Sequence, residues 1–283
     1  MNPTSSHSEW LGKNFLPPAE RIVSLVPSLT EAVFMLDAGN QLAGRTEFCV
    51  RPADGVRGLP TIGGTKNPDI EMIRSLSPDL ILANREENTK EHVTSLAKNF
   101  PVLLTDPHGP EDVPALWMEL GAITGQSEKA RARADEVLST HALIRLERLY
   151  PNEKPPHFIY FVWKNPWIAA GHDTYISNML AAAGFQNALP PERARFPKLA
   201  EKEILPIDAD VHFYSSEPFP FVLPKDLLIS PGTQPRPIPG GFLVHNGILA
   251  LGIDAEPLSW YPSQTAAGLR YAARLYDIVV RSS

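Results

Sequence analysis

The chain contains little cysteine, no long apolar run and no excess of basic charge. Of its 283 residues one is a cysteine, Cys49, which excludes an internal disulfide, a C-x-x-C metal site and a redox pair. No apolar run approaches the ~20 residues that a helix needs to cross a bilayer. Lys and Arg number 26 against 32 Asp and Glu, which gives a formal net charge of −6. A phosphate backbone would meet no positive field here, so we expect no nucleic-acid partner.

The sequence also lacks the motifs that usually mark an enzyme. It contains no G-x-G-x-x-G or G-x-x-x-x-G-K-[ST] loop to cradle a phosphate, and no G-x-S-x-G turn to present a nucleophilic serine. The histidines never occur as H-x-H or H-x-x-x-H, the spacings that place two imidazoles on one metal ion. Because no base, nucleophile and orienting group can be assembled, we predict that the protein is not an enzyme, has no cofactor of its own and holds no metal ion through its own side chains.

The start of the chain lacks the features of a secretory leader. Residues 1–20 contain no basic stretch followed by an apolar run of ~7–15 residues. Taken by itself, this predicts a cytoplasmic protein, although a chain already trimmed to its mature form would look the same.

Strands and helices alternate in the first half of the chain. Ser28-Leu-Thr-Glu31 follows Pro27 and has the pattern of a capping box, so we expect a helix that begins there and stops at Gly39. The alternation predicts an α/β lobe with a mostly parallel sheet. Short apolar runs predict its buried strands at 21–26, 79–83 and 102–105.

A long charged segment separates this lobe from a second one. From Ser127 to Tyr150 apolar residues recur every three or four positions without Gly or Pro, which predicts a helix of roughly 24 residues. A second α/β set follows, with strands at 157–162 and 210–214 and a helix at 174–183. We therefore predict two lobes joined by one helix. The expected boundaries are 1–20 for an N-terminal extension, 21–126 for the first lobe, 127–150 for the bridging helix and 151–283 for the second lobe.

A short segment in the first half of the chain is similar to one in the second half. In the first half Pro68 precedes Asp79-Leu-Ile-Leu by 11 residues, and in the second half Pro197 precedes Asp210-Val-His-Phe by 13. This suggests a repeat, with a difference of register between its copies.

Aromatic and polar residues gather in loops that follow predicted strands, where open α/β sheets place their ligands. Three of the five tryptophans, Trp163, Trp167 and Trp260, lie in such loops rather than in helical stripes, which suits a broad, flat ligand held by stacking and edge contacts. The candidate ligand-binding residues are Phe48, Thr65, Lys66, Asn67, Asn84, Trp163, Trp167, Glu217, Trp260, Tyr261 and Gln264.

Three motifs stand out: Arg21-Ile-Val-Ser-Leu-Val-Pro-Ser-Leu-Thr-Glu31, Gly64-Thr-Lys-Asn-Pro-Asp-Ile-Glu71 with Ser77-Pro-Asp-Leu-Ile-Leu82, and Gly171-His-Asp-Thr-Tyr-Ile-Ser177. At these motifs the chain resembles the helical-backbone metal receptor superfamily, the substrate-binding proteins of ABC importers for cobalamin and iron-siderophore complexes, and most of all its cobalamin-binding branch. The resemblance runs from about Arg21 to Leu275.

This resemblance implies two Rossmann-like lobes with mostly parallel sheets, a rigid bridging helix, and a metal chelate bound between the lobes. It also implies an extracytoplasmic, monomeric protein that docks on the membrane subunits of an importer through one surface glutamate per lobe. Glu71 matches the first docking position, and Glu201 or Glu203 the second. The chain departs from well-known cobalamin binders at Thr65, where they carry an aromatic residue, and near Trp260 and Gln264, where they carry Asp and Arg.

Three functions follow, in order of preference. The first is a solute-binding protein for cobalamin or another corrinoid, with Phe48, Trp163 and Trp260 as an aromatic sandwich. The second is a ferric-siderophore-binding protein of the same fold, in which basic residues offset an anionic chelate. These would be Arg45, Lys66, Arg85 and Lys164. The third is a cytoplasmic protein that stores, senses or passes a corrinoid, consistent with the absent leader.

Overall fold

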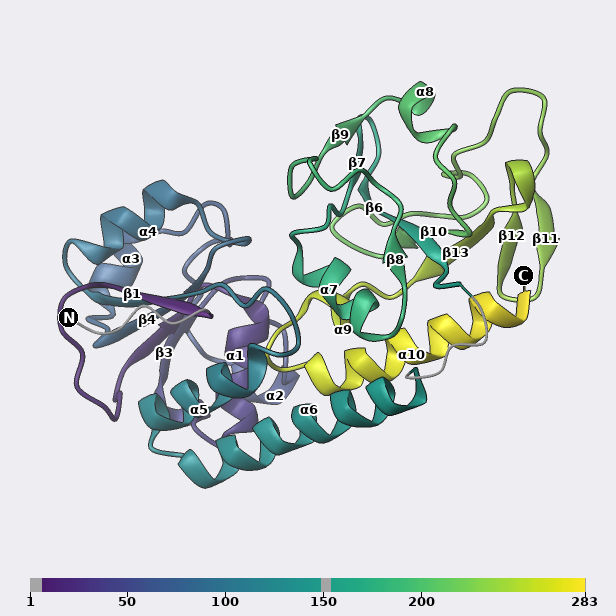
Figure 1. Ribbon diagram of the computed structural model, residues 1–283. Coiled ribbons are helices and arrows are strands. Elements are labelled where there is room, and N and C mark those ends of the chain that lie inside the picture. The colour runs from purple at the N-terminus through teal and green to yellow at the C-terminus, as the bar shows by residue number, and fades with distance from the viewer. Residues whose placement is uncertain (1–6, 149–153, 283) are drawn as a thin grey trace. The chain divides into compact units, whose positions relative to one another are not determined.

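The computed structural model describes residues 7–148 and 154–282, and the chain divides into two compact units (Figure 1). Unit 1 comprises Met1–Leu138 and Trp260–Thr265, and unit 2 comprises Ser139–Ser259 and Ala266–Ser283. The predicted domain boundaries remain predictions, and the segment 149–153 at one of them lies outside the described residues. Within the described ranges, no helix is long and apolar enough to cross a membrane.

Unit 1 is built on a five-stranded sheet in the order β1-β5-β4-β2-β3. All neighbouring strands are parallel except β1, which pairs antiparallel with β5 and comes from the segment expected to be an extension. The strands are β1 (Ser8–Gly12), β2 (Ile22–Ser24), β3 (Leu42–Arg45), β4 (Leu80–Asn84) and β5 (Pro101–Thr105). The helices are α1 (Pro27–Met35), the 3-10 turn η1 (Gly39–Gln41), α2 (Ala53–Val56), α3 (Ile70–Ser75), α4 (Lys90–Ala97) and α5 (Val113–Thr124).

Three strands of unit 1, β2, β4 and β5, form where the apolar runs predicted them, whereas β1 and β3 were not predicted and the start of α1 was predicted wrongly. Every residue of β4 is buried, as expected for a central parallel strand covered on both faces. Helix α1 begins at Pro27 with Val26 as N-cap, and no side chain caps it. Ser28 is therefore inside the helix, and Glu31 does not close a capping box. Proline at the first helical position explains the start, because its ring pre-sets a helical φ and its missing N–H is not needed there.

Unit 2 is built on an eight-stranded sheet in the order β11-β12-β13-β10-β6-β7-β9, with β8 beside β6. Its centre, β13-β10-β6, is parallel, and the outer pairs β11-β12, β12-β13, β6-β7 and β7-β9 are antiparallel. The strands are β6 (His157–Trp163), β7 (Trp167–Ala169), β8 (Gln186–Asn187), β9 (Lys198–Leu199), β10 (Val211–Ser215), β11 (Arg236–Ile238), β12 (Gly241–Leu243) and β13 (Leu249–Ile253). The helices are α7 (Tyr175–Ala182), α8 (Glu201–Ile204), the 3-10 turn η2 (His245–Gly247), α9 (Glu256–Ser259) and α10 (Thr265–Ser282).

The long charged segment forms helix α6 (Ser127–Glu147), which contributes its first half to unit 1 and its second half to unit 2. Arg148 is already in a turn, and the last two residues of the predicted helix lie outside the described residues. The predicted fold class is confirmed: the chain is α/β, with parallel strands at the centre of both sheets and one long helix shared by the two lobes.

The two similar segments form the same type of side-chain-to-backbone hydrogen bond in both units. The Asp79 carboxylate accepts hydrogen bonds from the backbone N–H of Glu20 at 2.7 Å and of Arg21 at 3.0 Å, at the start of β2. In unit 2 the Asp210 carboxylate accepts one from the backbone N–H of His157 at 2.6 Å, at the start of β6. In both units an aspartate at the start of one strand thus satisfies backbone donors that begin its parallel neighbour.

Candidate ligand-binding site

Unit 1 presents an exposed aromatic ring beside a glycine loop. The Phe48 side chain is 55% exposed. A Cβ atom at Gly64 would lie 3.1 Å from its Cε2 atom and would overlap the Asn67 side chain, so Phe48 and Asn67 flank the same glycine. Lys66, which precedes Asn67 in the glycine loop, is exposed. Its Nζ atom donates to the carbonyl oxygen of Glu86 at 2.5 Å. Three predicted ligand residues therefore lie together here.

Three other predicted ligand residues of unit 1 are buried and hydrogen-bonded to the protein. The Asn84 amide donates to Tyr261 Oη at 2.5 Å and to Thr105 Oγ1 at 3.3 Å. Burial raises the pKa of the Tyr261 phenol, which therefore stays neutral. Thr65 is also buried, and its carbonyl accepts from Asn88 Nδ2 at 2.9 Å. These side chains hold loops of unit 1 in place, and their assignment to the ligand stays a prediction.

A polar and aromatic cluster joins the late segment Trp260–Thr265 to the beginning of the chain within unit 1. Gln264 Nε2 donates to both carboxylate oxygens of Glu31 at 3.0 Å. The Arg51 guanidinium lies over the Trp260 ring, 4.4 Å from its centroid, and its Nε atom is 3.6 Å from Glu31 Oε1. Glu31 thus binds a side chain more than two hundred residues away, which explains why it does not cap its own helix.

Unit 2 contains a ladder of aromatic rings that leads from the surface into the core. Trp163, at the carboxyl end of β6, is 40% exposed and lies edge to face against Phe219 with 5.5 Å between ring centroids. Phe219 contacts Phe221 at 4.7 Å, and Phe221 stacks on Trp167 at 6.1 Å. Trp167 is only 4% exposed, and its Nε1 atom donates to Glu201 at 3.3 Å. Of these two predicted tryptophans, Trp163 therefore offers an exposed ring, and Trp167 belongs to the core of unit 2.

The last predicted ligand residue, Glu217, follows β10 and is half-buried. Burial, and then the negative charge of Glu217, raises the pKa of the Tyr160 phenol on β6. Glu217 therefore lies within electrostatic range of the central strands of unit 2.

The basic residues considered for an anionic siderophore are already engaged. Arg85 pairs with two carboxylates, at 2.6 and 3.1 Å, and Lys164 with one at 3.1 Å. Arg45 and Lys66 donate to backbone carbonyl oxygens. The paired carboxylates are Asp106 and Glu9 for Arg85, and Asp226 for Lys164. Because a neutralised cation attracts an anion less, these contacts weaken the siderophore hypothesis.

The docking position predicted for the first lobe is well exposed. The Glu71 side chain on α3 is 80% exposed and pairs with Arg74 at 2.6 Å, one turn along the helix. Such a surface pair contributes little to stability, so Glu71 remains available to another partner.

In the second lobe, the position that corresponds to Glu71 is occupied by a lysine when residues are counted back from Asp210, the counterpart of Asp79. Glu71 lies eight residues before Asp79, and the residue eight before Asp210 is Lys202. Glu201 and Glu203 flank it. Glu203 is held by the Ala200 backbone N–H at 2.9 Å, which is the main reason why its pKa is lowered. Neither glutamate matches Glu71 in register, and the docking assignment in this lobe stays a prediction.

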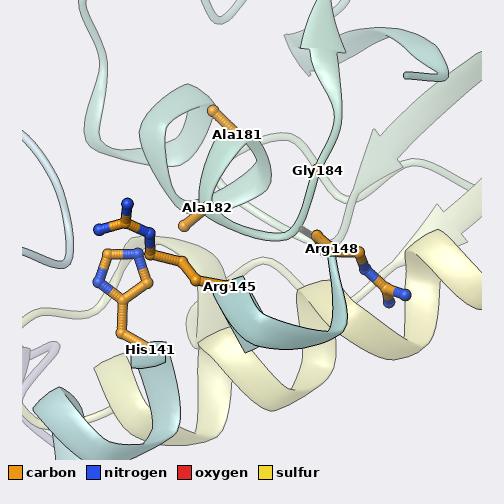
Figure 2. A pocket seen from close by; sticks show the side chains of 6 residues that line it. All are labelled: His141, Arg145, Arg148, Ala181, Ala182 and Gly184. Atoms are coloured by element: carbon orange, nitrogen blue, oxygen red, sulfur yellow. The ribbon is translucent and has the colours of Figure 1, made fainter. Parts of the chain in front are cut away.

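A surface pocket of about 330 Å³ in unit 2 contains none of the predicted ligand residues (Figure 2). His141 and Arg145 of α6 and Arg148 in the turn after it line the pocket opposite the last turn of α7, and Arg148 donates to the Ala183 carbonyl at 3.2 Å. Basic groups at a helix C-terminus stabilise the helix dipole, and the carbonyls there disfavour an anion. The lining residues are His141, Arg145, Arg148, Ala181, Ala182 and Gly184.

Sequence reasoning missed Arg51, Glu31 and Phe219 as possible site residues. Arg51 and Glu31 meet Trp260 and Gln264 only through the fold, so no local pattern marks them. Phe219 belongs to the aromatic loop after β10, and its alternation with proline in that loop was a usable signal. Within residues 7–148 and 154–282, no group of three or more His, Cys, Asp or Glu side chains could hold a metal ion.

Two α/β lobes with parallel central strands share one long helix and carry exposed aromatic rings at or just after the ends of strands, an arrangement typical of a substrate-binding protein. The family model described as "Periplasmic binding protein" matches residues 22–232. The chain belongs to this family, whose members bind solutes and are not enzymes, and the predicted resemblance is confirmed at that level.

The similar proteins bind related ligands. The vitamin B12-binding protein of Yersinia pestis (strain Pestoides F) is 24% identical over 188 residues, which are 66% of this chain and 66% of the relative. The chain thus spans just under two thirds of that relative's length. The periplasmic vitamin B12-binding protein BtuF of Vibrio cholerae has a TM-score of 0.76 at 18% identity, covering 93% of this chain and 99% of that one. The periplasmic heme-binding protein RhuT of Roseiflexus sp. RS-1 has a TM-score of 0.73 at 22% identity, with the same coverage.

Proposed function

We propose that this protein binds a planar metal chelate, with cobalamin or another corrinoid as the first candidate, and delivers it to an ABC importer outside the cytoplasm. Membership of the periplasmic binding protein family and the similarity to vitamin B12-binding proteins support the role and the ligand class. In this role the chelate is cargo, and no bond in it is made or broken.

The observation that carries the proposal is the exposed ring of Trp163 in unit 2, which lies against the half-buried Phe219. Two rings held edge to face at the carboxyl end of β6 give a rigid apolar surface, because Phe219 is in turn fixed by Phe221 and the buried Trp167. Aromatic rings that are already immobilised lose little conformational entropy on binding, and they suit the face of a macrocycle. In unit 1 Phe48 offers a second exposed ring.

Titration calorimetry with cyanocobalamin, dicyanocobinamide and hemin tests the proposal. We expect at least one of them to bind, and Trp163→Ala to weaken that binding by about tenfold or more, the usual effect of removing an aromatic anchor. Phe196→Ala is the matched control, since Phe196 lies in the same unit and is similarly exposed, at 37%. No heat with any of the chelates, or equal effects of the two substitutions, would refute the proposal.

Heme is the second candidate ligand, because the similar solved structures include heme-binding proteins. The calorimetric comparison separates it from a corrinoid directly. A cytoplasmic corrinoid-handling role is the third, and localisation of the native protein by cell fractionation distinguishes it from importer delivery.

For importer docking we propose Glu71 as the main contact of the first lobe, because it is the most exposed of the candidate glutamates that pair with an arginine. We expect Glu71→Lys to abolish stimulation of the reconstituted importer's ATPase while chelate affinity stays unchanged. Glu128→Lys on the exposed first turn of α6 is the control. In the second lobe Lys202 lies between Glu201 and Glu203, so we expect single substitutions of these glutamates to have smaller effects than Glu71→Lys. Full stimulation by the Glu71→Lys protein would exclude the assignment.

A further inference from the structure

The Phe219 ring lies on an irregular loop of unit 2. Residues 216–228, all of which the structure describes, follow β10 and contain neither a helix nor a strand. Three of them are prolines, namely Pro218, Pro220 and Pro224. Because proline has no backbone N–H, these positions supply no donor that could fix the loop. The loop therefore depends on side-chain contacts to hold Phe219 against Trp163, which belongs to β6.

The Asp226 carboxylate closes this loop on itself. Its Oδ2 atom accepts from the backbone N–H of Val222 at 2.8 Å, and the Asp226 N–H donates to the Val222 carbonyl at 3.0 Å. The hydrogen bond from Val222 is the main reason why the pKa of Asp226 is lowered, and Lys164 lowers it further. The carboxylate is therefore ionised at neutral pH, although its side chain is only 12% exposed.

Lys164 links the closed loop to the β6–β7 hairpin. It lies in the turn between these two antiparallel strands, directly after Trp163. Its Nζ atom is 3.1 Å from Asp226 Oδ1 and 5.5 Å from the centroid of the Trp167 ring, within the range of a cation–π contact. The ammonium thus contacts the loop through a charge and the hairpin through a ring. Because the Lys164 side chain is largely buried, salt screens this ion pair less than a surface pair.

The loop and the hairpin also meet through their aromatic rings. Phe219 lies against Trp163 with 5.5 Å between ring centroids. Phe221 stacks on Trp167 at 6.1 Å. A binding surface that is assembled from two segments is effective only when each segment is held to within about 0.5 Å of its place.

We propose that Lys164 and Asp226 are positioning residues for chelate binding. Their ion pair ties the loop 216–228 to the hairpin and sets the Trp163 and Phe219 rings relative to each other, without contacting the chelate. The proposal rests on the proposed function, because it concerns the aromatic surface on which that function depends. In this role the Lys164 charge serves Asp226 and not an anionic chelate.

The test uses whichever of cyanocobalamin, dicyanocobinamide and hemin the wild-type protein binds in calorimetry. Asp226→Asn and Lys164→Met should each weaken its binding by about fivefold to tenfold. The double variant should bind no more weakly than either single variant, because both changes break the same contact. Lys164→Arg keeps the charge and should stay within about twofold of the wild type. Lys225→Met, at an exposed lysine of the same loop, is the matched control and should leave the affinity unchanged.

A Trp163→Ala background shows whether the ion pair acts through the ring. In this background Asp226→Asn should weaken binding by less than about twofold, because the ring that it positions is already absent. An equal loss in both backgrounds would mean that Asp226 supports the fold in general, and would overturn the proposal. Thermal unfolding of each variant gives the temperature range in which all of them are folded, and affinities are compared within it.

Two other results would also overturn the proposal. Tighter binding by the Asp226→Asn protein would show that the released Lys164 ammonium contacts an anionic chelate directly. Wild-type affinity in both single variants would show that the ion pair is not needed. These results leave the proposed function standing, whereas no binding of any chelate by the wild type would refute that function and this inference with it.

Discussion

Acid should destabilise unit 2 through two buried histidines. His212 on β10 is fully buried, and His245 in η2 is 4% exposed, with 6.0 Å between the ring centroids. Neither ring nitrogen of either residue has a hydrogen-bond partner among the described residues. Burial, and then the neighbouring His245, lowers the pKa of His212 from 6.5 to about 3, and burial also lowers the pKa of His245.

The sign and size of the effect follow from proton linkage. His212 is neutral in the folded protein, whereas the unfolded chain takes up a proton as the pH falls below 6.5. The free energy of unfolding therefore decreases as the pH falls from 6.5 towards 3. Each pH unit in this window corresponds to about 1.4 kcal/mol, so His212 alone should lower the free energy of unfolding by about 2 kcal/mol between pH 7 and pH 5. His245 adds to the loss in the same direction.

The substitution His212→Phe removes this titration and replaces an unpartnered polar ring by an apolar ring of similar size. At pH 7 it should be neutral or stabilising, because a buried polar group without a hydrogen bond costs about 1–3 kcal/mol. Urea unfolding at pH 7, 6 and 5, followed by tryptophan fluorescence and circular dichroism, measures the difference between variant and wild type at each pH.

We expect the stability advantage of His212→Phe to grow by about 2 kcal/mol from pH 7 to pH 5. His108→Gln, at an exposed histidine of unit 1, should leave the wild-type pH dependence unchanged. Parallel curves of unfolding free energy against pH for wild type and His212→Phe would refute the reasoning.

Three further predictions concern stability. Asn84→Ala should lower the free energy of unfolding by about 1–3 kcal/mol, because it removes the buried hydrogen bond that Tyr261 Oη accepts from the Asn84 amide; thermal unfolding measures this, and an unchanged midpoint would contradict it. Gly268→Ala on α10 should strongly reduce the yield of folded protein, since its Cβ would overlap the Pro257 carbonyl oxygen. Gly252→Ala, whose Cβ would have its nearest neighbour 3.6 Å away, should be tolerated. Equal yields of the two variants would contradict this prediction. Glu119→Leu should free β1 from the sheet edge, because the carboxylate accepts from Ser8 at 2.6 Å and Trp10 at 2.7 Å; faster hydrogen exchange in β1 is the expected readout, and unchanged protection would argue against it.

Much of the fold could be predicted from the sequence because its signals are local. The apolar runs at 79–83 and 102–105 became β4 and β5 within one residue, and the charged periodic segment from Ser127 became α6. The capping box at Ser28 failed because Pro27 starts the helix one residue earlier and Glu31 has a distant partner. The capping-box pattern is present in the sequence, but the Glu31 carboxylate binds Gln264 and not the backbone of its own helix.

The exposure of the candidate site residues could not be predicted from the sequence, since it depends on residues far apart in the chain. Trp163 and Trp167 look alike in the sequence, yet Trp163 is 40% exposed and Trp167 is 4% exposed because Phe221 stacks on the latter. Asn84 and Tyr261, both predicted to contact a ligand, hydrogen-bond to each other across 177 positions, which no local pattern indicates.

The sequence by itself determined the alternation of strands and helices, the absence of enzyme motifs and the membership of a family of solute-binding proteins, because periodicity and short motifs are properties of neighbouring residues. Only the tertiary structure decided which aromatic rings are exposed, which cations are neutralised and that Arg51 lies over Trp260. These properties depend on side chains that the chain brings together from distant positions, and no local pattern encodes them.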